Sequence, residues 1–369
     1  MPGSIRVFHL IHDLGPGGAE HVLVDLASVA AGAGIDLTVV SMLPTDGLRY
    51  PEQLRAAGAR VASLDLRAWW DPRGPRRLRR LVEIGRPDVL HSHLKHADFI
   101  AGRVASRSGI PHVSTLHVIE RDVSGIALFK RNLAARSRRR TAAATVAVSE
   151  AMRGWYLEEF AEEPGRVVTI RNGVPDPGEP LEGTRAAVRA ELGIVPDALV
   201  AATIAVMRPG KGHEVLLEAA RSSAGVVFLL VGDGPLEGRL RSLAADLPPG
   251  RVVFGGFRED VDRILAAADL VVHPSLADAL PTALIHAIAA SRPVIASDVG
   301  GVSEIVTPGA GILVAPGDAA ALAAAVASLA GDPEERAAMG KHGRERYDEE
   351  FGADRWAGRL RSLYERVVG

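Results

Sequence analysis

Short apolar runs rich in β-branched residues alternate with longer helix-like segments along almost the whole chain, and this rhythm limits the possible folds more than any other feature. Such alternation predicts parallel β-sheets whose strands are joined by helices, an α/β fold. In the first half, strands are expected at residues 5–11, 37–41, 61–64, 89–92, 112–116, 144–148 and 167–170. In the second half, they are expected at residues 199–204, 225–231, 252–254, 270–273, 294–297 and 311–314.

A proline-rich stretch separates the two series of strands. After Asn172 and Gly173 the chain reads Val-Pro-Asp-Pro-Gly-Glu-Pro, which can continue neither a helix nor a strand. A length of 369 residues also fits two domains of ordinary size. We therefore predict an α/β domain at 1–175, a second one at 176–350, and a C-terminal helix at 351–369 that buries one apolar face.

Composition excludes several classes of protein. The chain has no cysteine, so disulfides, thiolate metal ligands and cysteine nucleophiles are ruled out. No segment approaches the roughly 20 apolar residues of a membrane span, and the first residues lack the pattern of a secretory signal. We therefore expect a cytoplasmic location. The net charge of -2 gives no general reason to bind nucleic acid, and no such partner is expected.

Basic residues are nevertheless concentrated in one region. Between Arg60 and Arg140 the chain has 18 Lys and Arg against 7 Asp and Glu. The part from Lys130 to Arg140, preceded by several apolar residues, indicates a basic amphipathic helix. It could lie on anionic lipid at the inner face of the plasma membrane or guide an anionic ligand, with a solvated helix face as the simpler alternative.

Candidate ligand-binding residues of the first domain follow its strands. Asp13, Gly17 and Gly18 lie in a glycine-rich turn after the first strand, where backbone amides can approach a phosphate or a sugar. A dinucleotide fingerprint would need a third glycine where Glu20 stands, so hydride chemistry is disfavoured. A plain turn is the alternative.

Histidines follow two later strands of the same domain. His91 and His93, with His96 close by, could suggest a metal site, but no third ligand is evident, and polar residues lining the end of a strand are the preferred interpretation. His117 follows the strand at 112–116, at the edge where ligands bind in open α/β sheets. A purely structural histidine is the alternative for His117.

The second domain carries a basic turn between a strand and a helix. Arg208 and Lys211 lie beside the start of that helix, which favours a diphosphate site over a solvated turn only in combination with other motifs. Gly232 and Asp233 offer a tight loop after the next strand. Phe257, which follows the strand at 252–254, offers an apolar wall for a nucleoside. A simple turn is the alternative for both loops.

A further loop and helix follow the strand at 270–273. Asp278 lies in the loop, and Leu280, Pro281 and Thr282 open a helix whose free amides attract phosphate; Pro281 is expected in its first turn. His286 should lie one to two turns into that helix, within reach of the same bound ligand. The only Asp-x-Asp, at 260–262, fits the surface of a helix N-terminus, and no metal site is expected.

Taken in order, these motifs resemble glycosyltransferase family 4, retaining enzymes of the GT-B fold, over nearly the full length of the chain. The motifs that carry the resemblance are Leu14-Gly-Pro-Gly-Gly-Ala-Glu20, His91-x-His93, Thr115-Leu-His117, Val146-Ala-Val-Ser-Glu150, Ile170-Arg-Asn-Gly173, Arg208-Pro-Gly-Lys-Gly212, Val231-Gly-Asp-Gly-Pro235 and Arg292-Pro-Val-Ile-Ala-Ser-Asp-Val-Gly-Gly-Val-Ser-Glu304. The resemblance implies two Rossmann-like domains facing across a cleft, with the C-terminal helix crossing back onto the first.

The resemblance also implies an activity and residue roles. The enzyme would move a hexosyl group, with retention and without a metal or other cofactor, from a UDP- or GDP-sugar to a hydroxyl of a glycan, lipid-linked or small-molecule acceptor. The first domain would present the acceptor and the second would bind the donor. His117 and Asp278 would act at the donor sugar. The donor side would comprise Gly17, Gly18, Arg208, Lys211, Gly232, Asp233, Phe257, Leu280, Pro281, Thr282 and His286, and the acceptor side Asp13, His93 and Asn172.

Two departures from the family pattern matter. The family's Glu-x7-Glu pair maps onto Asp278 and His286, so the glutamate that accepts hydrogen bonds from the ribose is replaced by a histidine. The family's arginine stands five residues before its lysine, where this chain has Val206, whereas Arg208 is three residues before Lys211. A protein that binds nucleotide sugars without turnover, or an epimerase or phosphorylase of the same fold, stays open as an alternative.

Overall fold

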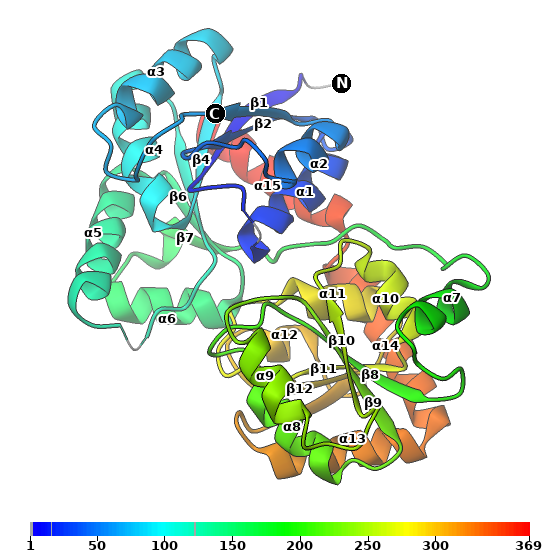
Figure 1. The fold of residues 1–369 in the computed structure, drawn as a ribbon. Helices are drawn as coiled ribbons and strands as arrows, with labels where there is room; N and C mark the ends of the chain where they lie inside the picture. Colours follow the sequence, from blue (N-terminus) through cyan, green and yellow to red (C-terminus); the bar gives the residue numbers. More distant parts are fainter. Residues whose placement is uncertain (1–2, 16, 122) are drawn as a thin grey trace. The chain divides into compact units, whose positions relative to one another are not determined.

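The computed structural model describes residues 3–15, 17–121 and 123–369, and the chain forms two compact units. The first, the N-terminal unit, combines Met1–Pro175 with Gly352–Gly369. The second, the C-terminal unit, is the continuous segment Asp176–Phe351. Each unit has its own sheet, with helices packed around it (Figure 1).

The sheet of the N-terminal unit has seven parallel strands in the order β3-β2-β1-β4-β5-β6-β7. The strands are β1 (Ile5–Ile11), β2 (Ile35–Ser41), β3 (Arg60–Ser63), β4 (Val89–His93), β5 (His112–Leu116), β6 (Ala144–Ala147) and β7 (Val167–Thr169). The helices are α1 (Gly18–Ala30), α2 (Tyr50–Ala56), α3 (Gly74–Gly85), α4 (Leu94–Ser108), α5 (Gly125–Thr141), α6 (Glu150–Phe160) and α15 (Ala353–Val368). The strand order reverses between β1 and β4, and open α/β sheets bind ligands at the carboxyl ends of such a pair.

The C-terminal unit repeats this plan with six parallel strands in the order β10-β9-β8-β11-β12-β13. The strands are β8 (Leu199–Ile204), β9 (Val226–Val231), β10 (Val252–Gly256), β11 (Leu270–His273), β12 (Val294–Ser297) and β13 (Gly311–Val314). The helices are α7 (Thr184–Glu191), α8 (His213–Ser222), α9 (Glu237–Ala244), α10 (Val261–Ala267), α11 (Thr282–Ala289), α12 (Val302–Ile305), α13 (Ala319–Gly331) and α14 (Pro333–Glu350). Its point of reversal lies between β8 and β11.

The predicted parallel sheets are confirmed, and the strand ends differ from the prediction by at most two residues. The largest differences are at β2, which begins at Ile35, and at β10, which ends at Gly256. The end of β10 contains two consecutive glycines, which lack the side-chain pattern of a strand, and its pairing with β9 shifts register between Phe254 and Gly256.

The C-terminal helix α15 is part of the core of the N-terminal unit. Trp356, Leu360 and Leu363 are buried in one apolar cluster with residues of β1, β2 and α1. The amide of Ala353, at the start of the helix, donates a hydrogen bond to the carbonyl oxygen of Val174 at 3.0 Å. Since a buried side chain of this size contributes roughly 1.5–3 kcal/mol, α15 is an integral element of the unit.

Candidate functional site

A lysine, an aspartate and a histidine meet in the C-terminal unit at the point where its strand order reverses. Lys211 lies in the loop after β8, and its Nζ is 2.6 Å from Oδ2 of Asp278, in the loop after β11. The same carboxylate oxygen lies 2.9 Å from Nε2 of His273, the last residue of β11. The fold thus brings together two residues that the sequence singled out and one that it did not.

The surroundings of Asp278 favour its charged form. Burial opposes ionisation, because the carboxylate loses contact with water. The hydrogen bond with His273 and the positive charge of Lys211 outweigh burial and hold the pKa of the Asp278 carboxyl well below its usual range. Asp278 in turn holds the ammonium group of Lys211, whose side chain is only 15% exposed. A cation fixed in this way is suited to meet a phosphate group.

Two glycines allow the loops around this cluster to pack without space between them. Gly212 has φ of +72°, and a Cβ there would lie 1.8 Å from the carbonyl oxygen of Pro274. Gly232 has φ of +132°, and a Cβ there would lie 2.2 Å from the carbonyl oxygen of Ala205. No other residue fits either position unless the backbone moves, so these glycines are needed for the shape of the site.

Backbone hydrogen bonds join the same loops into one layer. The amide of Met207 donates to the carbonyl oxygen of Asp233 at 2.6 Å, and the amide of Leu276 donates to that of Gly210 at 2.8 Å. The side chains of Asp233 and Arg208 are exposed. Of the two cations predicted in the basic turn, the structure therefore holds Lys211 in place and leaves Arg208 at the surface.

The start of α11 forms the next part of this edge. Leu280 and Pro281 are buried, and Thr282 is the first helical residue. Pro281 itself has extended backbone and caps the helix, one position earlier than the predicted place in the first turn. The amide of Gly301 donates to the carbonyl oxygen of Ala279 at 3.0 Å and fixes the approach to the helix. The first amides of α11 are thus presented at the carboxyl edge of the sheet.

His286 lies on the second turn of α11, and its Nδ1 is 4.0 Å from Oδ1 of Asp262. Burial raises the pKa of Asp262. Phe257, beyond the end of β10, is 39% exposed. Phe257 and Asp262 follow β10 in the chain, and His286 follows β11.

In the N-terminal unit, the glycine-rich turn lies between β1 and α1. Gly17 caps α1, Gly18 is its first residue, and the carboxylate of Asp13 accepts a hydrogen bond from the backbone two residues later at 3.0 Å. A Cβ on Gly17 would lie 2.1 Å from Oε2 of Glu20, so a larger residue there would require that carboxyl to move. Burial, with Asp13 adding to it, raises the pKa of Glu20 to about 7. Pro16 lies outside the described residues.

The predicted histidines of the N-terminal unit lie together. Nδ1 of His93 is 2.8 Å from Nε2 of His117, which brings the two predicted residues into direct contact. Both line a cavity of about 10 Å³ that Asn172 also touches. His9, from β1, lies close to His91 and His93, with ligand nitrogens within 4.8 Å of one another. The sequence made no third ligand evident beside His91 and His93, and the fold brings His9 to them.

Three residues of these clusters escaped the sequence analysis. His273 ends a strand, and a histidine in that position could have been noticed by the same rule that selected His117. His9 lies within a strand and has the period of inward-facing residues, but pairing with β4 was needed to place it beside His91. Tyr364 reaches the cluster from α15, some 270 residues away in sequence from His91, and no local pattern could reveal that contact.

The basic helix α5 differs from the prediction in its details. Arg131 and Arg138 are buried, and Nε of Arg138 lies 2.8 Å from Oδ2 of the buried Asp98. Because they are buried, these two arginines are structural. Helical period alone does not distinguish a basic residue that faces solvent from one that pairs with a buried acid.

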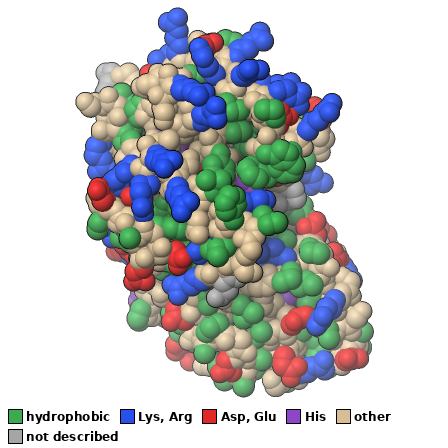
Figure 2. Space-filling model, turned by 90° about the vertical axis from the view of Figure 1, so that its left-hand side faces the viewer, with side chains coloured by type: hydrophobic (Ala, Val, Ile, Leu, Met, Phe, Trp, Pro, Cys, Tyr) green, Lys and Arg blue, Asp and Glu red, His purple; other side chains and the backbone are tan. Residues whose placement is uncertain are grey.

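Within the described ranges, no helix is long and apolar enough to cross a membrane. Figure 2 shows lysine and arginine side chains gathered over the N-terminal unit, with apolar side chains among them.

Comparisons with known proteins add the family. The family model described as Glycosyltransferase Family 4 matches residues 16–176, and the model described as Glycosyl transferases group 1 matches residues 184–346. An alpha-maltose-1-phosphate synthase of Mycolicibacterium smegmatis is 32% identical over 308 residues, which cover 76% of this chain and 79% of that protein. A D-inositol 3-phosphate glycosyltransferase of Saccharomonospora viridis is 30% identical over 315 residues, covering 78% and 72%.

A solved structure gives the same result for the fold. The Anabaena protein HepE, determined in complex with UDP and glucose, superimposes with a TM-score of 0.86 over 98% of this chain and 99% of that one, at 21% identity. The two family models cover both units in turn, and the mycobacterial relative is matched over most of its length. The chain therefore belongs to glycosyltransferase family 4 and is a glycosyltransferase of the GT-B fold.

Proposed function

We propose that the protein transfers a hexosyl group from a nucleoside diphosphate sugar, with the donor bound at the carboxyl edge of the C-terminal sheet. The observation that carries this proposal is the group formed by Lys211, Asp278 and His273 at the point of strand reversal. The fixed cation and the first amides of α11 both follow strands at the carboxyl edge of this sheet, and a diphosphate site uses both kinds of group. The structure of HepE in complex with UDP-glucose supports UDP as the nucleoside diphosphate of the donor.

The proposed chemistry uses charge already present in the protein. As the bond from the sugar to the diphosphate breaks, Lys211 and the amides of α11 offset the negative charge that develops on the leaving group. Because these groups supply the positive charge, we expect no metal requirement. Asp278 orients the donor sugar and His117 contacts it. With retention, the leaving phosphate oxygen takes the proton of the attacking acceptor hydroxyl on the same face of the sugar.

The N-terminal unit is proposed to present the acceptor, a hydroxyl of a glycan, a lipid-linked sugar or a small molecule. Asp13 follows β1, His93 ends β4 and Asn172 follows β7, so all three lie at the carboxyl edge of its sheet. Burial raises the pKa of Glu20 to about 7, so near neutral pH this carboxyl is only partly ionised.

A thermal-shift screen against UDP-, GDP-, ADP- and dTDP-sugars, with and without EDTA, tests the donor assignment. A ligand at about 100 times its Kd stabilises the protein by about 2.7 kcal/mol, which raises Tm by roughly 5–10 °C for a unit of this size. We expect one nucleotide to give such a shift, and EDTA to leave it unchanged. The absence of any shift would contradict the proposal.

His286 provides a matched pair of variants for the same screen. His286→Glu restores the acceptor that the family uses for the ribose hydroxyls, so we expect donor affinity to rise about tenfold, which corresponds to about 1.4 kcal/mol. His286→Ala, which has no acceptor, should bind no better than the unchanged protein. Equal affinities in all three would show that the histidine does not contact the nucleotide. Binding without hydrolysis or transfer in any of them would favour the non-catalytic alternative.

We further propose that the outer face of α5 contacts anionic membrane. Ile126 and Phe129 are 74% and 65% exposed. The basic residues Arg136 and Arg140 follow them on the same face at helical spacing, and both are exposed. A helix with apolar and basic residues on one exposed face binds at the surface of an anionic bilayer.

Vesicle co-sedimentation tests the membrane contact. Phe129→Ser should lower the fraction bound to phosphatidylglycerol vesicles several-fold, because it removes an apolar group that enters the headgroup region. Ile84→Ser, at another exposed apolar position on α3, serves as the control and should change binding little. Equal binding to phosphatidylcholine vesicles, or no effect of Phe129→Ser, would exclude this face of α5 as the contact.

A further inference from the structure

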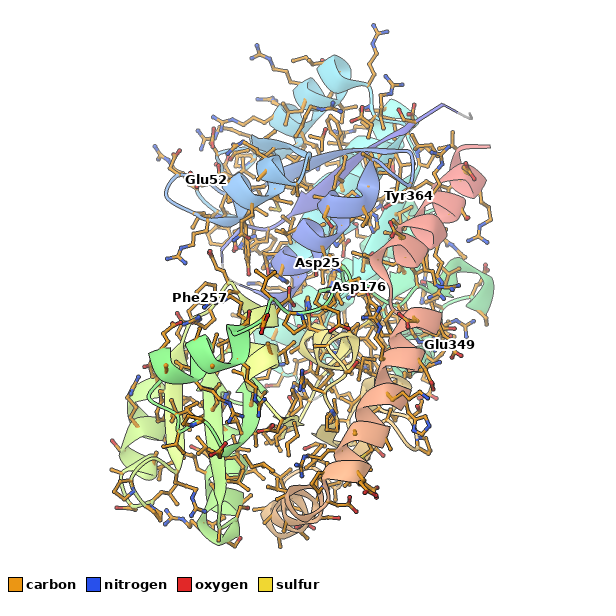
Figure 3. All side chains as sticks on the ribbon, turned by 90° about the vertical axis from the view of Figure 1, so that its right-hand side faces the viewer. Asp25, Glu52, Asp176, Phe257, Glu349 and Tyr364 are labelled. Carbon is orange, nitrogen blue, oxygen red and sulfur yellow. The ribbon has the colours of Figure 1, made fainter. Side chains whose placement is uncertain are left out.

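Six polar side chains of the N-terminal unit, five of them buried, form one continuous hydrogen-bonded chain that ends at His117. From the far end to His117, its five links measure 2.6, 2.7, 3.1, 2.8 and 2.8 Å. The members, in order, are Thr115, His91, Tyr364, His9, His93 and His117. Thr115 lies in β5, His91 and His93 lie in β4 and His9 lies in β1, which are adjacent strands, and His117 directly follows β5. Tyr364 comes from α15 (Figure 3).

The arrangement of this chain differs from that of a metal centre. His9, His91 and His93 have nitrogens within 4.8 Å of one another, which is compatible with metal binding. However, both ring nitrogens of each of these histidines already serve as links of the chain. A bound ion would have to break several buried hydrogen bonds, each of which costs free energy when a partner is left unsatisfied.

The histidines of the chain are neutral. Burial lowers the pKa of His9 to about 3 and that of His117 to about 4. Burial, together with the neighbouring histidines, lowers the pKa of His91 and His93 well below the usual value. A neutral imidazole has one nitrogen that donates and one that accepts. Each histidine that lies between two neighbours therefore accepts from one of them and donates to the other.

This property forces all the links to point the same way. If one histidine were reversed, two protons would meet at one link and two lone pairs at another, and both clashes would be buried. The hydroxyl of Tyr364 has a single proton, so it also donates to one histidine and accepts from the other. The chain has two consistent states, one with protons directed toward His117 and one with protons directed away from it.

Thr115 selects between these states. Among the residues of the protein that the structure describes, the Thr115 hydroxyl has one side-chain partner, Nε2 of His91. When Thr115 donates to that nitrogen, every buried proton of the chain has an acceptor. In the reversed state, the buried hydroxyl proton of Thr115 would lack this acceptor. The favoured direction makes Nδ1 of His93 the donor to Nε2 of His117.

We propose that Thr115, His91, Tyr364, His9 and His93 are positioning residues that fix His117 as the tautomer protonated on Nδ1. His117 then presents Nδ1–H as a hydrogen-bond donor and has no free acceptor. This tautomer makes His117 a hydrogen-bond donor to an oxygen of the donor sugar, a role that rests on the proposed function. It also gives α15 a specific role, because Tyr364 joins His91 to His9 in the hydrogen-bonded chain.

The tautomer can be measured without any substrate. In two-bond ¹H–¹⁵N spectra of protein labelled at histidine, protonated and unprotonated ring nitrogens resonate in separate regions, and His117→Gln identifies the signals of that ring. We expect Nδ1 of His117 to be protonated. Tyr364→Phe breaks the chain in the middle and Thr115→Val removes its terminal proton, so each should give a mixture of both tautomers. Thr115→Ser retains the hydroxyl and should restore the single form.

Controls separate this role from a general effect on folding. Tyr156→Phe removes a hydroxyl from another buried tyrosine of the same unit, outside the chain, and should leave the His117 spectrum unchanged. In transfer assays, Tyr364→Phe and Thr115→Val should lower kcat about tenfold with little change in KM, and Thr115→Ser should restore it. An unprotonated Nδ1 in the unchanged protein, or an unaltered spectrum in both variants, would overturn the proposal. A shift in tautomer without an effect on kcat would uphold the chain and contradict the proposed role of His117.

Discussion

Lys211→Ala is expected to lower kcat/KM for transfer about 10²- to 10³-fold, the effect of removing one fixed electrostatic contact to a developing charge. The ammonium group is fixed by Asp278 at 2.6 Å, so its loss removes an interaction that costs no reorganisation when the donor binds. Initial rates with the donor found in the thermal-shift screen would measure the change. Part of the loss should also appear as a smaller thermal shift with the nucleoside diphosphate alone.

Arg208→Ala is the matched control for Lys211→Ala. Both residues are cations of the same loop, but Arg208 is exposed. We expect a loss of less than about tenfold, the scale of an exposed charge. If Arg208→Ala were the more damaging variant, the family's displaced arginine would have its counterpart at Arg208, and the assignment of the diphosphate to Lys211 would be wrong.

Asp98→Ala is expected to lower the free energy of unfolding of the N-terminal unit by about 3–5 kcal/mol, the cost of leaving one buried charge without its partner. Asp98 is 1% exposed, and its Oδ2 pairs with Nε of Arg138 at 2.8 Å. Its other oxygen accepts hydrogen bonds from the hydroxyls of Ser92 and Ser114. The variant would leave the buried guanidinium of Arg138 without its carboxylate and would remove an acceptor from two buried hydroxyls.

Urea unfolding followed by tryptophan fluorescence measures this loss in the right part of the molecule. The four tryptophans of the chain, at positions 69, 70, 155 and 356, all belong to the N-terminal unit. Asp88→Ala is the control, because Asp88 pairs with Arg6 at 2.8 Å while the two side chains are 30% and 43% exposed. Such pairs contribute about 0–1 kcal/mol. Similar losses in both variants would contradict the structural role given to Asp98.

Much of the fold could be predicted because parallel strands buried on both faces leave a clear mark in the sequence. The runs at residues 5–11 and 199–204 consist almost wholly of residues that suit a buried strand, and both are strands with these bounds. The turns rich in glycine and charge then fall at the carboxyl ends of strands without further assumption. This places Lys211 and Asp278 near each other, because β8 and β11 are neighbours.

The rest of the candidate site depends on contacts between distant segments. The role of His273 follows from its contact with Asp278, and that of His9 from pairing between β1 and β4. Arg138 could not be separated from the exposed arginines of α5, because its partner Asp98 lies 40 residues earlier in the sequence. Sequence periodicity reports which face of an element is apolar, but it does not identify the polar partners buried beneath that face.

The membership of α15 in the N-terminal unit has a consequence for synthesis on the ribosome. The C-terminal unit is one uninterrupted segment, Asp176–Phe351, whereas the core of the N-terminal unit includes Trp356 and Leu363. These residues are translated after the whole of the C-terminal unit. The nascent N-terminal unit must therefore keep an apolar surface uncovered while the later unit emerges and folds. Although it is translated second, the C-terminal unit is the first that can reach its complete structure.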